Sequence, residues 1–329
     1  MNAVLDSAQQ IAPGRSCPLS YRYAPEDFAR EPQIKAQTLY VAGGLYGNIE
    51  ALDAIEAMYA QEPGTASADK QMVFNGDFHW FDADAALFAA INRRVSAHVA
   101  LRGNVETEIA QDDSGAGCGC AYPDDVDDAT VERSNQIIAR LQQIARTDTK
   151  ARHWLATLPM TAVAQVGAAR VGIVHGDAES LAGWNFDAAS LDDPAHAHWL
   201  RAVFDAARVN IFASSHTCAA ALRVFGGERA VINNGAAGMS SVPGSPHGIV
   251  TRIGLAPAAS HLPVLASATV AGVYVQALAV QFDAAAWNRR FLAMWPAGSA
   301  AHQSYWARIT GGPKQSMLHA AGHHCSGTE

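Results

Sequence analysis

Four side chains that can bind a metal follow apolar, strand-like runs in the sequence. Asp77 ends the run QMVFNGD, and Asn104 ends AHVALRGN. His175 follows ARVGIV, and His216 follows VNIFASS. Because sites in open sheets lie beyond the carboxyl ends of strands, these side chains are expected to converge. One carboxylate, one amide oxygen and two imidazoles suit Mn, Fe or Zn, so the sequence predicts a transition-metal site with open coordination positions.

Two other residues near these motifs can take part in the chemistry. His79 lies two residues after Asp77, so in an extended backbone both side chains face the same side. An imidazole there can bind a metal or exchange a proton near neutral pH, which makes His79 the candidate catalytic group. The alternative is that His79 only packs beside Trp80 and Phe81. Cys218 is a candidate metal ligand as a thiolate, or a small apolar residue that fills space.

Strands and helices alternate from residue 38 onward. The first half reads as a βαβαβ succession, with strands over 38–43, 71–77 and 97–104 and helices over 48–60 and 83–94. Short crossovers of this kind predict neighbouring parallel strands. The second half contains several β runs, which favours two packed sheets. We therefore expect an α/β fold, a four-layer αββα sandwich of two mixed sheets flanked by helices.

The chain is expected to divide into an N-terminal extension (1–37), a main domain (38–294) and a C-terminal segment (295–329). The tail from Gly311 is predicted to be disordered. An insertion over about 105–157 begins with a loop, residues 105–132, that has nine acidic residues and no Lys or Arg. Cys118 and Cys120 in this loop can bind metal or sense redox state, but partner ligands are missing. A solvated loop is the favoured interpretation.

Composition limits the possible partners and the location. The 329 residues carry a formal net charge of -8, which argues against a broad nucleic-acid surface. The N-terminal residues lack the features of a signal peptide, and no run offers the roughly 20 apolar residues of a membrane span. The five cysteines follow no disulfide framework. We expect a cytoplasmic protein that binds small molecules or proteins; its oligomeric state is not indicated.

Five dipeptides carry a family resemblance, and they are Gly47-Asn48, Gly76-Asp77, Gly103-Asn104, His175-Gly176 and His216-Thr217. Their order and spacing over residues 38–253 resemble the motifs of calcineurin-like metallophosphoesterases. The segment VINNGAAG at 231–238 is similar to the strand and turn that close this fold. Each dipeptide alone is a weak signal, but five in the same order after predicted strands are specific together.

The resemblance implies two metal sites, of which this chain keeps the ligands of one. The retained ligands are Asp77, Asn104, His175 and His216. At the three positions that hold the other metal alone, this chain has Gly44, Tyr46 and Cys218. All three substitutions fall on one site and spare the other, which random loss explains poorly. We therefore expect one divalent or trivalent transition metal, with a second site open to substitutes such as His79 and Cys218.

The resemblance also implies a function, with one departure. The family's histidine that is thought to protonate the leaving group is Val105 here, and the adjacent Glu106 is expected to be ionised and a poor acid. The first hypothesis is a metal-dependent phosphatase or phosphodiesterase that hydrolyses a small phosphorylated substrate through a metal-activated water. The second is a catalytically weak or inactive protein that acts as a metal-stabilised module for binding a ligand or a protein.

Overall fold

The computed structural model describes residues 12–112, 115–316 and 318. One six-stranded sheet has the order β11-β12-β10-β2-β3-β4. Its strands are β2 (Thr38–Ala42), β3 (Lys70–Asn75), β4 (Val99–Leu101), β10 (Gly248–Gly254), β11 (Val264–Val270) and β12 (Val273–Val280). β2, β3 and β4 are parallel neighbours, as the βαβαβ pattern predicts. β10 joins β2 antiparallel, so the sheet is mixed.

A second six-stranded sheet has the order β1-β5-β6-β7-β9-β8. Its strands are β1 (Ile34–Ala36), β5 (Thr161–Val166), β6 (Ala169–Val174), β7 (Ile211–Ser214), β8 (Ala220–Phe225) and β9 (Arg229–Asn234). β6, β7 and β9 are parallel, while β5 pairs antiparallel with β6 through a short turn at Gly167. β1 comes from the predicted N-terminal extension and pairs with β5, so part of that segment belongs to this sheet.

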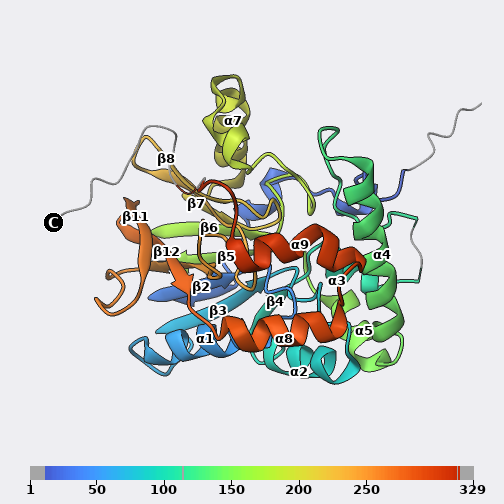
Figure 1. Cartoon of the computed structure of the whole chain (residues 1–329). Helices are drawn as coiled ribbons and strands as arrows, with labels where there is room; N and C mark the ends of the chain where they lie inside the picture. The colour runs from blue at the N-terminus through green and yellow to red at the C-terminus, as the bar shows by residue number, and fades with distance from the viewer. Residues whose placement is uncertain (1–11, 113–114, 317, 319–329) are drawn as a thin grey trace, which may run out of the picture.

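Helices cover the outer face of each sheet (Figure 1). They are α1 (Ile49–Gln61), α2 (Ala85–Val95), α3 (Asn104–Ala110), α4 (Asp128–Ala145), α5 (Thr149–Thr157), α6 (Ala188–Asp192), α7 (Ala197–Ala207), α8 (Ala284–Met294) and α9 (Ala300–Gly311), with 3-10 turns at Leu19–Tyr21, Pro25–Ala29 and Pro194–His196. α1, α2 and α8 lie under the first sheet, and α7 lies over the second. The predicted α/β sandwich of two mixed sheets flanked by helices is confirmed.

The apolar core has three layers that hold this sandwich together. Side chains of both sheets, such as Val41 and Ile173, form the middle layer. Leu52 of α1 and Phe291 of α8 belong to the cluster outside the first sheet. Phe204 of α7 packs outside the second sheet. Within the described residues, no helix has the length and apolar content required to cross a membrane.

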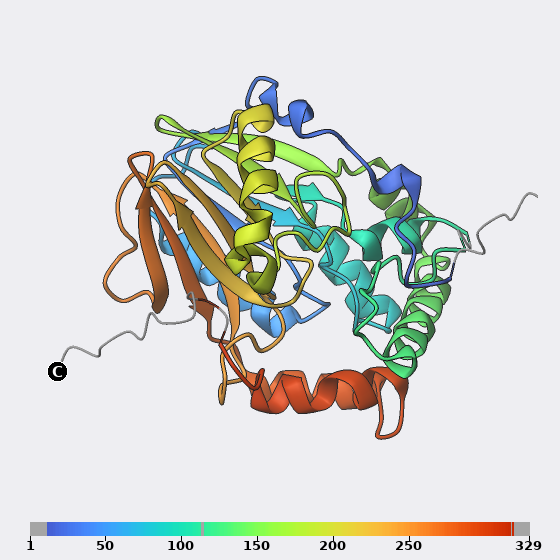
Figure 2. The same cartoon turned by 90° about the horizontal axis from the view of Figure 1, so that it is seen from above.

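The segment between β4 and β5 differs from the predicted solvated loop. Residues 104–110 form α3 rather than a loop. Cys118 and Cys120 are buried and form a disulfide. α4 and α5 follow, and Arg133 of α4 donates to the Ser304 hydroxyl of α9 at 2.6 Å. Figure 2 shows α9 at the margin of the molecule, beside the end of α4. Most of the tail predicted to be disordered lies outside the described residues.

A buried ion pair joins the end of α1 to β10. Arg252 Nε lies 2.6 Å from Glu62 Oε1, and Nη2 lies 3.0 Å from Oε2. The hydroxyl of Tyr40 also donates to Glu62 Oε1 at 2.8 Å. Burial raises the pKa of Glu62, but the hydrogen bonds from Arg252 and Tyr40 lower it below its ordinary value. The folded state therefore favours the ionised carboxylate.

We expect Glu62→Gln to lower the free energy of unfolding by about 3–5 kcal/mol, because it leaves the Arg252 charge buried without its counter-ion. Since the folded pKa of Glu62 is depressed, this stabilisation is present above the unfolded pKa of about 4.3 and is lost as pH falls through the folded value. Urea unfolding of both proteins at several pH values measures this. Glu56→Gln, which removes a more exposed partner of Arg94, is the control and should cost less than about 1 kcal/mol.

Candidate metal centre

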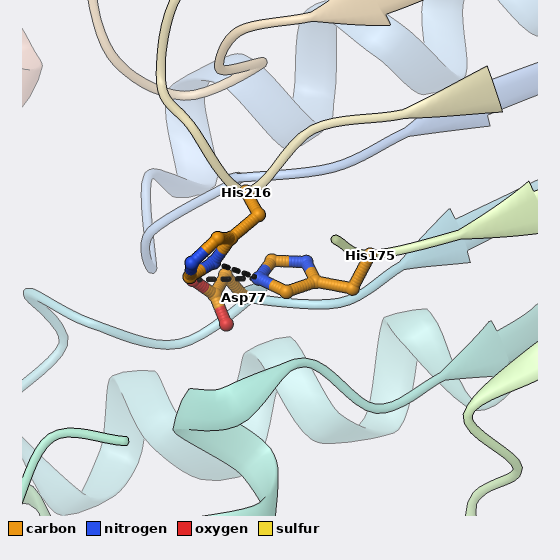
Figure 3. A group of neighbouring side chains, drawn as sticks. All are labelled: Asp77, His175 and His216. Atoms are coloured by element: carbon orange, nitrogen blue, oxygen red, sulfur yellow. Dashed lines mark hydrogen bonds and ion pairs between the residues drawn. The ribbon is translucent and has the colours of Figure 1, made fainter. Parts of the chain in front are cut away.

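The four predicted ligands lie at the ends of strands from both sheets. Asp77 follows β3 and Asn104 follows β4 in the first sheet, while His175 follows β6 and His216 follows β7 in the second. All four are at least nine-tenths buried. Asp77, His175 and His216 place ligand atoms within 4.8 Å of one another, and Figure 3 shows their side chains pointing to a common point. The two sheets therefore bring together residues that are far apart in sequence.

Nε2 of His175 is the centre of this group. It lies 3.2 Å from Asp77 Oδ2, 3.1 Å from Asn104 Oδ1 and 3.1 Å from His216 Nδ1. The amide of Asn104 is oriented by its Nδ2, which donates to the Cys118 carbonyl at 2.9 Å. Its oxygen therefore faces the imidazoles, so the four predicted ligands are within contact distance of one atom.

The outer nitrogens of both histidines are engaged with backbone carbonyls. Nδ1 of His175 lies 3.1 Å from the carbonyl of Asn75, and Nε2 of His216 lies 3.1 Å from that of Cys120. A carbonyl only accepts, so these nitrogens carry the protons of the neutral rings. The lone pairs of His175 Nε2 and His216 Nδ1 then face the oxygens of Asp77 and Asn104. Four acceptors that meet in this way attract a cation, and this donor set fits a transition metal.

The pKa values of the two histidines agree with this arrangement. Burial lowers the pKa of His175, but the nearby carboxylate of Asp77 and its hydrogen bond raise it above the ordinary value. Burial, followed by the charge of His175, lowers the pKa of His216 to about 3. His216 is therefore neutral at pH 7 and able to bind a metal. The centre attracts one positive charge, which is a proton on His175 or a metal ion in its place.

Two glycines let the loops approach closely enough for this centre to form. A Cβ at Gly76 would lie 2.5 Å from the backbone nitrogen of Gly103 and 2.7 Å from His175 Nδ1. A Cβ at Gly103 would lie 2.3 Å from Asp77 Oδ1. Any other residue at either position would therefore push the β3 and β4 loops apart. Asp77 itself has a φ of 52°, a left-handed conformation that Asp tolerates better than most residues.

Glu106 forms hydrogen bonds to the backbone of the same two loops. Its Oε2 accepts from the backbone nitrogens of Asp77 at 2.7 Å and Gly103 at 2.9 Å, and its Oε1 accepts from that of His79 at 3.2 Å. Burial and the charge of Asp77 raise the pKa of Glu106 to about 6. This value is higher than expected from sequence, yet the carboxylate remains mostly ionised at pH 7. Its role here is to position the loops.

The positions of the other metal site in the family pattern are filled by side chains that bond to each other. The hydroxyl of Tyr46 lies 2.8 Å from Cys218 Sγ. Burial raises the pKa of the Cys218 thiol above its ordinary value, which disfavours the thiolate that metal binding needs. Cys218 does not join Asp77, His175 and His216 in the cluster of ligand atoms. Its predicted role as a ligand stays a prediction, and these contacts favour the space-filling alternative.

His79 points away from the metal centre. Its Nδ1 lies 2.5 Å from Asp82 Oδ2, its Nε2 lies 3.2 Å from Asn92 Oδ1, and its ring stacks on Phe88 at a centroid distance of 4.2 Å. The ring is completely buried and does not line the cavity beside the cluster. The catalytic role of His79 stays a prediction, and its contacts favour the packing alternative, although the partners are Asp82, Asn92 and Phe88.

These contacts predict a stability effect for His79→Ala. The substitution removes one partner of a buried pair and leaves the Asp82 carboxylate unpaired, so the free energy of unfolding should fall by about 3–5 kcal/mol. Chemical denaturation, with metal content measured in parallel, checks this. His198→Ala, at an exposed position, is the control. Wild-type stability together with a loss of turnover would contradict the structural role and support the catalytic one.

A cavity of about 240 Å³ opens beside the metal centre. Its lining includes Asp77, Asn104 and His216 together with Val105, which occupies the position of the family's acid. Sequence reasoning named Tyr46, Trp80, Cys120, Thr217 and Cys218 for other reasons, and it did not identify the remaining walls, which are Tyr122, Val126, Thr130, Trp184, Ser304, Tyr305 and Arg308. The only available signal was their residue types, because segments far apart in the sequence supply them.

The architecture, with its carboxylate, amide and imidazoles at the strand ends, is the calcineurin-like metallophosphoesterase fold that the motifs predicted. A crystal structure of a metallophosphoesterase from Sphaerobacter thermophilus aligns with a TM-score of 0.51 and 15% identity, covering 85% of this chain and 100% of that chain. A hypothetical protein from Pyrococcus horikoshii OT3 aligns with a TM-score of 0.54 and 14% identity, covering 84% and 99%. No protein-family model and no curated protein matches the sequence. These likenesses show the fold.

Proposed function

We propose that this protein is a metal-dependent phosphoesterase that uses one transition-metal site to hydrolyse a small phosphorylated substrate. The observation that carries the proposal is the convergence of acceptor atoms from Asp77, Asn104, His175 and His216 without a donor among them. A centre that attracts a cation at the strand ends of this fold, beside a cavity, is what metal-assisted hydrolysis needs.

In this proposal the residues around the centre have different roles. Asp77, Asn104, His175 and His216 would hold an Mn, Fe or Zn ion. When bound, the metal would polarise the phosphoryl group and lower the pKa of a water. The carbonyls of Asn75 and Cys120 fix the orientation of the two imidazoles, as outer partners of metal ligands do.

The described walls of the cavity offer no good acid for the leaving group. Val105 is apolar, and burial followed by the charge of Cys218 raises the pKa of Tyr46 well above its ordinary value. The hydroxyl of Tyr46 is therefore a poor proton donor at neutral pH. Substrates whose leaving group departs as a stable anion should react faster than those that need protonation.

A second candidate function is binding without hydrolysis. It is favoured by the contact between Tyr46 and Cys218, which fills the place of a second metal, and by the absence of an acid at Val105. In that case the metal centre would stabilise the fold and hold a phosphorylated ligand or a protein partner. Both candidate functions include the bound metal, and they differ in whether the substrate is hydrolysed.

The test is a metal count combined with a hydrolysis assay. Elemental analysis after loading with Mn, Fe or Zn should give about one equivalent per chain, and bis(p-nitrophenyl) phosphate, an activated phosphodiester, should be hydrolysed only by the loaded protein. Asp77→Asn should lower both metal content and turnover. About two equivalents at full occupancy would contradict the single site, and no turnover with any of the three metals would favour the binding module.

A further inference from the structure

The cavity beside the metal centre is unusually rich in aromatic side chains. Five of its sixteen lining residues are aromatic, whereas aromatic residues make up 8% of the chain. They are Tyr46, Trp80, Tyr122, Trp184 and Tyr305. Tyr46 and Trp80 are buried, while Tyr122, Trp184 and Tyr305 are partly exposed. All five rings therefore give the cavity an aromatic lining.

Trp184 and Tyr122 form the aromatic wall next to the metal centre. Their ring centroids lie 6.1 Å apart, and the ring of Trp184 meets that of His216 edge to face at 5.2 Å. Trp184 is held in place by its Nε1, which donates to the carbonyl of Cys120 at 3.1 Å. A planar group stacked on this wall would therefore be adjacent to a predicted metal ligand.

Trp80 and Tyr305 form a second aromatic pair on the lining. Their rings meet at nearly a right angle with centroids 6.3 Å apart.

The cavity of about 240 Å³ is larger than the roughly 150 Å³ that holds a benzene ring. It is smaller than the roughly 300–1,000 Å³ of sites for drug-sized ligands. The space suits one aromatic ring together with a small charged group.

Arg308 of α9 adds a positive charge to this lining. Its Nε donates to the carbonyl of Ser240 at 3.0 Å, and its Nη2 donates to the carbonyl of Cys218. Among the ion pairs of the described residues, none involves Arg308. Carbonyls orient a guanidinium without neutralising it, so the full charge is available to an anion. This cation and the metal centre are both part of the cavity wall.

We infer that the cavity selects an aryl phosphoester: Arg308 binds the phosphoryl group and the Trp184 and Tyr305 walls stack on the aromatic ring. The inference rests on the proposed function for the identity of the charged group. It agrees with the lack of an acid at Val105, because an aryl oxide leaves with less help from protonation than an alkoxide does. Arg308 and the aromatic walls are thus the specificity-determining residues.

The experiment compares phenylphosphonate with methylphosphonate, two non-hydrolysable probes, by calorimetry on the Mn-loaded full chain. Phenylphosphonate should bind more tightly by about tenfold or more, the range expected when one ring stacks on an aromatic side chain. Trp184→Ala and Tyr305→Leu should each reduce that preference, and Trp184→Phe should largely retain it. Arg308→Gln should weaken the binding of both probes. Tyr274→Leu, at a half-buried tyrosine outside the cavity, is the matched control. It should change neither the affinity for the two probes nor the preference for phenylphosphonate.

Equal affinity of wild type for the two probes would overturn the inference, as would an unchanged preference in both Trp184→Ala and Tyr305→Leu. Binding of both probes that is unaffected by Arg308→Gln would remove Arg308 from the site. These outcomes are separate from the proposed function, because binding is measured without turnover. A phenyl preference without hydrolysis supports this inference in a binding module, whereas hydrolysis without the preference contradicts this inference alone.

Discussion

His216→Ala should prevent metal binding and abolish most of the proposed phosphoesterase activity. The side chain provides Nδ1 to the centre, and its other nitrogen is fixed by the Cys120 carbonyl. Loss of an outer partner alone lowers metal affinity or activity by about 10–100-fold, so loss of a direct ligand should reduce turnover by on the order of 10² or more. Elemental analysis and hydrolysis of bis(p-nitrophenyl) phosphate measure the two effects.

The same variant should lose the part of its stability that comes from metal binding. A metal present at about 100 times its dissociation constant stabilises the native state by about 2.7 kcal/mol. Wild-type protein should therefore melt at a higher temperature with metal than after treatment with a chelator, while His216→Ala should show little difference. His198→Ala, which changes an exposed histidine, should behave as wild type. Unchanged metal content in His216→Ala would exclude it as a ligand.

The sequence predicted the sandwich and the convergence of the four side chains at the strand ends because both depend on short-range patterns. Apolar runs that end in polar residues identify the strand ends, and parallel strands bring those ends to one edge. Asp77 and His216 could therefore be placed in one site although they lie on different sheets. The walls of the cavity could not be predicted in this way. Trp184 and Tyr305 have no shared spacing, and only tertiary packing brings them to one cavity.

The position of His79 shows where the local reasoning failed. The expectation that His79 and Asp77 face the same side assumed an extended backbone. Asp77 instead has a φ of 52°, which breaks the alternation of side chains and turns His79 toward Asp82. The loop around Cys118 was misjudged for a related reason, since acidic and glycine-rich composition suggested solvent exposure. The carbonyls of Cys118 and Cys120 are instead partners of Asn104 and His216.

The backbone is left-handed at Gly44, Tyr46 and Cys218, the positions of the other metal site in the family pattern. Gly44 has a φ of 64°, Tyr46 of 56° and Cys218 of 58°. Asp and His adopt this left-handed region more readily than most residues, whereas Tyr and Cys have no such preference. The present residues therefore occupy conformations that suit the ligands of the family pattern. A Cβ at Gly44 would lie 3.1 Å from Tyr46 Cζ and 3.2 Å from Ala236 Cα, so an aspartate at position 44 fits more easily beside a smaller ring at position 46.

The combined variant Gly44→Asp, Tyr46→His and Cys218→His is therefore expected to bind a second metal. It restores the ligand types at all three positions and removes the contact between the Tyr46 ring and a Cβ at position 44. The metal content measured by elemental analysis should rise from about one to about two equivalents per chain, as in two-metal hydrolytic sites. The metal content of Tyr46→His alone, which restores only one ligand, should remain near one equivalent per chain. A folded triple variant that still binds about one metal would show that these loops no longer hold that site.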